Sequence, residues 1–392
     1  MGQDIFEISI NAIKMVLIFL MMVQIVPVLV WVERRGSAFI QNRLGPNRIG
    51  PLGLTQLLAD AVKFLFKEEF LPDKAHRFLF YGAPIVALIP GALAFGSIPL
   101  SMPIQLEPFQ QMIFGFNLET TKNYTFAFQS FDIGIGIVFV LGVSSLGAYA
   151  LLMAGWSSNN KFSLMGALRA SAQMISYELA LGLSLVGVLL LYNTFTFSDM
   201  IAMQQGPLTI SFMGSDKVVS FLPNWGIFFQ PLGAIIFFAA TFAETNRLPF
   251  DLPEAEAELV AGYHTEYGGL KMLMFYIGEY GHMLVASALM VTFYFGGYNI
   301  PMIEPGQIVE HFVGHGLSNN QANVLSAFLL HGVFFIKVLI FLWIFIWVRW
   351  SLPRFRYDQL MDLGWKTMLP WALGNTIVTA VVILILRNKW VQ

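Results

Sequence analysis

The chain has 392 residues, of which 56 % are hydrophobic and only 12 % are charged, and its formal net charge is −2. Soluble proteins carry about 25 % charged residues and nucleic-acid binders carry dense basic runs, so the composition favours a membrane protein and argues against a nucleic-acid partner. The chain has no cysteine, which excludes disulfides, cysteine-bound zinc and iron–sulfur clusters on this chain.

Apolar stretches recur along the whole sequence, and about 20 apolar residues are enough to cross a membrane as a helix. The predicted fold is therefore all-α, a polytopic membrane helix bundle with eight transmembrane helices and an amphipathic interfacial helix. The first stretch is too long for a signal peptide and lacks a cleavage site, so we expect it to be retained. The predicted spans lie near residues 11–32, 78–100, 131–154, 169–192, 225–243, 271–298, 324–348 and 368–386.

The distribution of basic residues predicts the orientation of the bundle. Most of the Lys and Arg residues fall in one set of loops, residues 33–77, 155–168, 244–270 and 349–367. By the positive-inside rule these loops face the cytoplasm, and both termini then lie outside. The outer loops, residues 101–130, 193–224 and 299–323, are long and polar without evident chemistry.

The first inner loop contains the predicted interfacial helix, residues 53–70. Apolar residues recur there at helical spacing, with Asp60, Lys63 and Lys67 off the apolar face, as in helices that lie in the membrane interface. A helix that simply packs on the bundle fits the pattern equally well.

Ionisable residues also occur within the predicted spans, where charges are costly and usually face a partner or an ion path. A rise of about 1.5 Å per residue places Glu178, Glu279 and Lys337 at similar depth on the inner half, with Glu244 at the inner end of its span. A structural ion pair between Lys337 and one glutamate is the alternative for any single residue, whereas the set as a whole favours a polar path.

Two histidines within spans, His282 and His331, raise the possibility of a haem with two histidine ligands. Their expected depths differ by roughly 11 Å when counted at 1.5 Å per residue, which does not suit one axial pair. Packing in the core or hydrogen bonding is the preferred interpretation of both.

The third inner loop concentrates acids in the segment "AETNRLPFDLPEAEAELVAGYHTEYGG", residues 243–269. It holds six acids (Glu244, Asp251, Glu254, Glu256, Glu258 and Glu266) and one base, Arg247. Taken alone, such a run is usually a solvated acidic loop. Clustered carboxylates also raise one another's pKa values and bind protons in coupled titrations.

Five segments carry the most distinctive sequence: "ERRGSAFIQNRLGPNRIGPLGLTQLLADAVKFLFKE", "AGWSSNNKFSLMGALRASAQMISYE", "AETNRLPFDLPEAEAELVAGYHTEYGGLK", "GEY" and "RWSLPRFRYDQLMDLGWK". They strongly resemble the quinone-site membrane subunit of respiratory complex I, the H subunit of NADH:quinone oxidoreductase. The resemblance covers all inner loops and nearly every span. It implies an eight-helix subunit between the proton-pumping membrane arm and the soluble redox arm.

The resemblance also implies roles for individual residues. It assigns one set to the quinone chamber: Arg34, Asp60, Lys63, Arg247, Phe250, Arg349 and Arg354. It assigns a second set to a proton path: Glu178, Glu244, Glu254, Glu256, Glu258 and Glu279. Arg349 and Arg354 are further expected to hold the acidic loop by ion pairs. No catalytic residue and no metal site is expected on this chain.

The sequence departs from the family pattern in two places. Some relatives carry an acid in the third span where this chain has Ser144 and Ser145, which puts a direct carboxylate step there in doubt. The three outer loops are longer than is common in the family.

The predicted function is that of a translocase subunit, which takes part in NADH:quinone oxidoreduction but does not oxidise NADH alone. Quinone is the expected substrate, with FMN and iron–sulfur clusters on partner subunits. The expected partners are the other membrane-arm and soluble-arm subunits and membrane lipids, in a bacterial cytoplasmic (inner) membrane. Two alternatives are a stand-alone proton- or ion-coupled transporter, for which we find no repeats, and a structural anchor.

Overall fold

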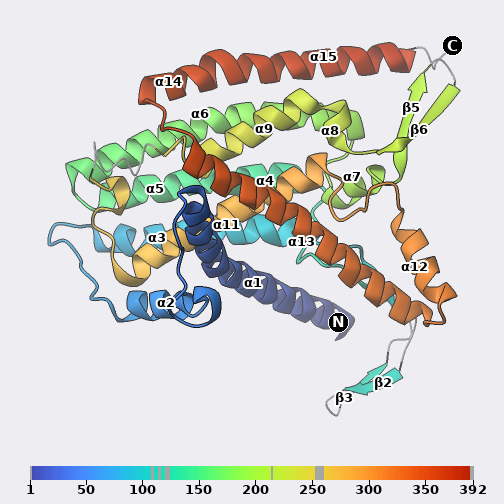
Figure 1. Cartoon of the computed structure of the whole chain (residues 1–392), viewed down its shortest axis with the longest axis horizontal. Helices are drawn as coiled ribbons and strands as arrows, with labels where there is room; N and C mark the ends of the chain where they lie inside the picture. The colour runs from blue at the N-terminus through green and yellow to red at the C-terminus, as the bar shows by residue number, and fades with distance from the viewer. Residues whose placement is uncertain are drawn as a thin grey trace.

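The computed structural model describes residues 2–106, 110–113, 116–119, 124–212, 215–251 and 260–388. Long helices run side by side through the molecule (Figure 1). Six of them are α1 (Gly2–Ile40), α3 (Arg77–Ser97), α6 (Lys161–Tyr192), α11 (Gly269–Tyr294), α13 (Asn319–Ser351) and α15 (Leu369–Asn388). A short helix, α14 (Tyr357–Asp362), leads through a π-helical turn at Leu363–Met368 into α15. The all-α membrane bundle is therefore confirmed.

Two of the expected spans are interrupted. The third consists of α4 (Gly136–Ser144) and α5 (Leu146–Ser157), and the Ser145 hydroxyl donates a hydrogen bond to the Gly142 carbonyl at the break. The fifth consists of α8 (Gly226–Phe229) and α9 (Pro231–Glu244), with Pro231 at the break. Proline has no N–H to continue the helical ladder, and α9 keeps only 14 residues.

Seven helical stretches of the described part are long and apolar enough to cross a membrane, while α9 is a shorter apolar helix. The predicted count of eight is thus not confirmed by helix length. Because of the break before α9, the fifth predicted span contains no continuous helix long enough to be counted as a crossing.

Short elements gather at the two ends of the bundle (Figure 1). One end, here called the α2 end, carries α2 (Gln56–Phe66) and α14. The other, called the α12 end, carries α7 (Phe197–Met203), α12 (Pro305–Gly314) and both termini. Three antiparallel hairpins, which the sequence did not predict, also fall in the expected outer loops: β1 (Ile104–Leu106) with β4 (Tyr124–Phe126), β2 (Gln110–Ile113) with β3 (Phe116–Glu119), and β5 (Pro207–Phe212) with β6 (Ser215–Pro223). Smaller turns form η1 (Pro51–Gly53) and η2 (Gly262–His264).

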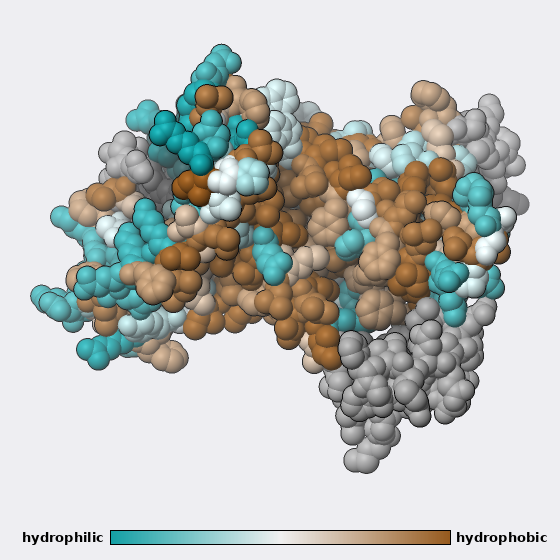
Figure 2. Space-filling model, turned by 60° about the horizontal axis from the view of Figure 1, so that its bottom comes forward, coloured by the Kyte–Doolittle hydropathy of each residue, from teal (hydrophilic) through white to brown (hydrophobic). Residues whose placement is uncertain are grey.

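The surface between the two ends is apolar. Figure 2 shows brown side chains across the middle of the molecule and teal side chains at both ends, most densely at one of them. Large hydrophobic residues such as Ile13, Ile336 and Val378 are more than half exposed on this surface. An exposed apolar surface of this extent suits lipid contact.

Helix α11 packs tightly in the core and is mostly buried. A Cβ atom added at Gly278 would lie 2.9 Å from the Ala87 carbonyl oxygen of α3. The glycine therefore permits close approach of α3 and α11, the two helices that flank the cavity described below.

Lys337 does not lie at the depth that the sequence predicted. Its ammonium group donates hydrogen bonds of 2.8, 2.9 and 2.6 Å to the carbonyls of Phe295, Gly297 and Asn299, and it lies 4.6 Å from the centroid of the Trp225 ring. These carbonyls follow the C-terminal end of α11, which ends at Tyr294 and not at residue 298. Carbonyls beyond a helix C-terminus lack helical partners, so Lys337 satisfies them and makes no ion pair with a carboxylate among the residues that the structure describes.

Candidate functional site

A buried glutamate near the α2 end joins several helices. Glu33 of α1 is 7 % exposed. Its carboxylate accepts a 2.5 Å hydrogen bond from Arg349 of α13 and a 2.7 Å hydrogen bond from the Tyr280 hydroxyl of α11. Charge-assisted hydrogen bonds of this kind offset much of the cost of burying a carboxylate.

Arg247 connects Glu33 to a second carboxylate. Its guanidinium nitrogens lie 3.9 Å from Glu33 Oε2 and 3.9 Å from Glu279 Oε2, and its Cζ lies 4.0 Å from the centroid of the Tyr280 ring. Glu279 also accepts a 2.7 Å hydrogen bond from the Tyr263 hydroxyl, and His264 Nε2 lies 3.7 Å from its Oε1. We call Glu33, Arg247, Glu279 and Arg349, with these aromatic partners, the buried charged network.

The turn after α9 brings Arg247 to this position. Asn246 adopts a left-handed conformation (φ 50°), which asparagine tolerates better than most residues, and the Arg247 N–H donates back to the Phe242 carbonyl. The Gln173 side chain of α6 donates to the carbonyls of Ala243 and Phe250, each at 2.8 Å. The Gln173 side chain therefore holds the turn at both of its ends.

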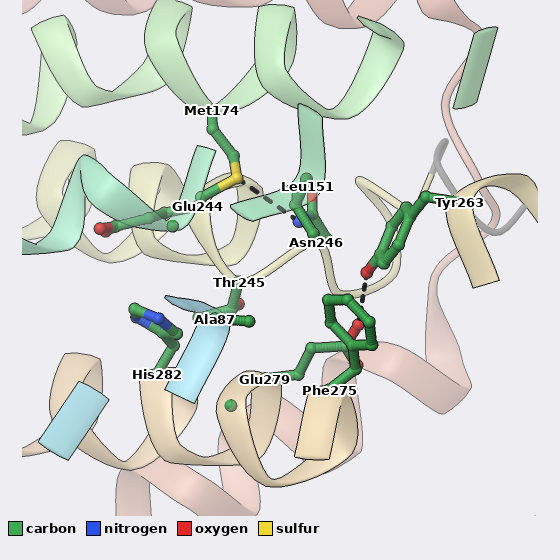
Figure 3. A pocket seen from close by; sticks show the side chains of 12 residues that line it. Ala87, Leu151, Met174, Glu244, Thr245, Asn246, Tyr263, Phe275, Glu279 and His282 are labelled. Carbon is green, nitrogen blue, oxygen red and sulfur yellow. Dashed lines mark hydrogen bonds between the residues drawn. The ribbon is translucent and has the colours of Figure 1, made fainter. Parts of the chain in front are cut away.

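A small cavity adjoins the network (Figure 3). Its volume available to the centres of water molecules is about 30 Å³, which is room for water but not for a quinone ring. Glu244, Glu279 and His282 contribute its ionisable side chains. The remaining lining residues are Ala87, Gly147, Leu151, Met174, Thr245, Asn246, Tyr263, Phe275 and Gly278.

Glu178 and Glu244 interact with each other electrostatically, and Glu244 also interacts with the Ser144 side chain at the end of α4. Glu178 is half-buried on α6. The structure therefore brings Glu244 and Glu279, two of the residues predicted for the proton path, to the cavity, and places a third, Glu178, within electrostatic reach of Glu244.

The predicted chamber residues fall into three places. Arg247 and Arg349 belong to the buried charged network. Arg34 forms a 2.5 Å ion pair with Asp60, which ties α2 to α1, and Lys63 is exposed one turn further along α2. Phe250 is buried, with ring centroids of Tyr177 and Phe355 at 5.3 and 5.5 Å.

The acidic loop is described at its two edges. Arg354 forms a 3.2 Å ion pair with Asp251, as expected for an arginine that holds the loop. Arg349 was expected to hold the same loop, but its described ion pair is with Glu33 of α1. Glu254, Glu256 and Glu258 lie outside the described residues.

At the other edge of the loop, Tyr267 stacks on Phe80 with ring centroids 4.2 Å apart. Burial raises the pKa of Tyr267 to about 12, against a smaller opposing effect of its hydrogen bond with Ser157. The phenol therefore stays protonated near neutral pH and fixes the loop without titrating.

Sequence reasoning missed several members of the site. No role is predicted from the sequence for Glu33, which directly follows the first predicted span, or for Tyr263, His264, Tyr280 and Gln173. The position of Glu33 at the end of an apolar span was a usable signal, because a glutamate is almost never fully buried unless it is paired. His282, predicted to pack in the core or to form a hydrogen bond, lines the small internal cavity.

The arrangement can hold and exchange protons. Two acids and an imidazole face a water-sized cavity, and an ion-paired network adjoins it. Proton transfer along such groups needs only direct or single-water reach from each one to the next.

Comparison with known proteins gives consistent matches along nearly the whole chain. A family model described as NADH dehydrogenase matches residues 13–380. The H subunit of NADH-quinone oxidoreductase from Bdellovibrio bacteriovorus is 65 % identical over 98 % of this chain and 99 % of that protein. The H subunit numbered 1 from Cytophaga hutchinsonii is 43 % identical over 91 % of each chain, and the H subunit numbered 1 from Geobacter metallireducens is 40 % identical over 97 % of this chain and 98 % of that protein.

Proposed function

The chain belongs to the NADH dehydrogenase family, together with these H subunits, and from that premise we propose that it is the membrane subunit of a proton-pumping NADH:quinone oxidoreductase (complex I). In this role it forms part of the quinone-binding chamber and couples quinone reduction to proton translocation. It acts as one subunit of the translocase and does not oxidise NADH alone.

The coupling role is supported by one observation: the buried charged network and the cavity share a residue. Glu279 takes part in both, because it faces Arg247 on one side and lines the cavity with Glu244 on the other. A change of charge at the network therefore alters the electrostatic potential at the first carboxyl groups of the proton path. This path consists of Glu279, Glu244 and Glu178. The loop acids Glu254, Glu256 and Glu258 are proposed to supply protons to it.

The quinone chamber is proposed to lie at the α2 end, outside the small cavity. Arg34, Asp60 and Lys63 on α1 and α2, together with Phe250, Arg247, Arg349 and Arg354, are its proposed chamber-lining or loop-fixing residues. The Arg34–Asp60 ion pair ties α2 to α1 and the Arg354–Asp251 ion pair holds one edge of the acidic loop, and both contacts support this assignment.

We propose that the chain crosses the membrane eight times. Both termini lie at the α12 end (Figure 1), so the number of crossings is even, and α8 with α9 supplies the crossing that the seven longer stretches lack. The α2 end then faces the cytoplasm and both termini lie outside, in the bacterial inner membrane. Partner subunits of both arms would hold the FMN and the iron–sulfur clusters, and quinone and lipid would contact this chain.

The proposal is tested in membranes where this chain is the sole H subunit. Glu279→Gln and Glu178→Gln keep size and hydrogen-bonding capacity but cannot titrate, so a native gel should show assembled complex. Quinone reduction and proton pumping should fall about tenfold or more, the usual contribution of a positioned acid or base. Normal assembly with wild-type pumping in both variants would leave these residues structural.

Reconstitution distinguishes the proposed subunit function from the rival function, a stand-alone proton- or ion-coupled transporter. Lipid vesicles that contain the purified chain alone should move neither protons nor sodium ions under an imposed gradient. Migration of the chain only as a monomer on the native gel, together with transport in these vesicles, would favour the transporter.

A further inference from the structure

His282 is a titratable residue in the cavity to which the proposed proton path gives no role. It follows Glu279 by three residues on α11, so the two side chains share one face of the helix. Both line the cavity that Glu244 of α9 also lines, and in Figure 3 the imidazole lies below the Glu244 side chain.

The packing of α11 directs the imidazole toward the interrupted third span. A Cβ atom added at Gly147 would lie 3.7 Å from His282 Nε2 and 3.4 Å from Met174 Cε, so the ring tip reaches the start of α5. A Cβ atom added at Gly91 of α3 would lie 3.7 Å from the His282 backbone nitrogen. Close packing by α3 behind the backbone therefore leaves the ring facing the cavity.

The surroundings of the ring contain acids and hydroxyl groups. Glu279 lies on the same helix as His282, and Glu244 of α9 lines the same cavity. Glu178 of α6 interacts electrostatically with Glu244. The third span contributes Ser144, which interacts with Glu244, and Gly147. Among the described residues that line the cavity, His282 is the one nitrogen base. It stands where the third span supplies no carboxylate.

We propose that His282 carries the proton between Glu279 and Glu244, an inference that rests on the function proposed above. The O–H bond of protonated Glu279 breaks and its proton passes through cavity water to His282 Nε2, which leaves a carboxylate and an imidazolium. The imidazolium then gives one proton to the Glu244 carboxylate and returns to neutral imidazole. One proton moves and no electron is exchanged. Imidazole suits this role because its two ring nitrogens let one side chain accept a proton and pass one on.

The test compares His282→Gln with His331→Gln in membranes that contain the assembled complex. His331 is a matched control, since it lies on α13 among the rings of Phe128 and Phe335. His282→Gln should assemble, with proton pumping and quinone reduction lowered about tenfold or more, and His331→Gln should retain both. Added imidazole should raise the rate of His282→Ala severalfold, because the truncated side chain leaves room for it, and should not change His331→Ala.

The outcomes separate this inference from the proposed function. Wild-type pumping in His282→Gln, with strong impairment in Glu279→Gln, would overturn the role of His282 and leave the subunit function intact. If His282→Gln does not assemble, the smaller His282→Asn and the imidazole response of His282→Ala replace it. Failure of all three variants to assemble would make His282 a packing residue and would also overturn the inference.

Discussion

Arg247 lies between the buried carboxylate of Glu33 and the partly buried carboxylate of Glu279, and its removal would leave both with fewer counter-charges. Arg247 is 6 % exposed and 3.9 Å from both Glu33 and Glu279. Loss of one partner from a buried ion pair costs about 3 to 5 kcal/mol. We therefore expect Arg247→Met to lower the thermal-inactivation temperature of the assembled complex markedly. The double variant Arg247→Met with Glu279→Gln should be less destabilised than Arg247→Met alone, because it removes one stranded charge.

The matched control for this stability measurement is Arg34→Met. Its ion pair with Asp60 is partly exposed, and exposed pairs contribute about 1 kcal/mol or less. Equal shifts of the inactivation temperature in Arg34→Met and Arg247→Met would show that the buried charged network contributes no more than a surface pair.

Individual residues were predicted unevenly from the sequence. Acids within apolar runs stand out, so Glu178, Glu244 and Glu279 could be singled out from hydropathy alone. The contacts of the buried charged network could not be predicted, because they join residues far apart in the sequence. The Arg349–Glu33 hydrogen bond joins residues 316 positions apart, and the Tyr280–Glu33 hydrogen bond joins residues 247 positions apart. Tyrosines and glutamines that hold a charged site have no local signature, since only the tertiary fold decides which of them meets a charge.

At the scale of elements, η2 is positioned by one glycine of α6. A Cβ atom added at Gly166 would lie 2.7 Å from Gly262 Cα and 3.1 Å from the Tyr263 nitrogen. Gly166→Ala should therefore push η2 away from α6 at a cost of about 1 to 3 kcal/mol. Because η2 carries Tyr263 and His264, which both face Glu279, quinone reduction should fall together with thermal stability.

Gly182→Ala on the same helix is the control, since a Cβ atom added there meets nothing within 4 Å. It should leave quinone reduction unchanged, and alanine's higher helix propensity favours a slight gain in stability. If Gly166→Ala and Gly182→Ala behave alike in both measurements, the close contact between α6 and η2 does not constrain the site.

The elements themselves follow hydropathy closely where the helices are unbroken. The break at Ser145 did not emerge from hydropathy, because the apolar run continues through it, whereas Pro231 within the fifth predicted span indicates a kink at the second break. The hairpins were missed because two-stranded pairing in polar loops leaves little periodic signal. The predicted helix of residues 53–70 corresponds to the shorter α2, Gln56–Phe66.

At the scale of the whole molecule, the absence of cysteine makes the orientation directly measurable. Glu310→Cys on exposed α12 and Asp73→Cys in the first inner loop would each introduce a single thiol at an exposed position. A membrane-impermeant maleimide applied to intact cells should label Glu310→Cys, and it should label Asp73→Cys only after the membrane is opened. The reverse pattern would invert the proposed topology.

The buried charged network also has a formal charge balance. Among the residues that the structure describes, two carboxylates, Glu33 and Glu279, face two guanidinium groups, Arg247 and Arg349, so the formal charges of these four groups sum to zero. A proton that arrives at Glu279 therefore leaves a net positive charge in a poorly polarisable environment, where uncompensated charge is costly. That excess is relieved when the proton moves on or when an anion approaches from the α2 end. These four groups carry no net charge when both carboxylates are ionised, so we expect an added proton to move on and not to accumulate there.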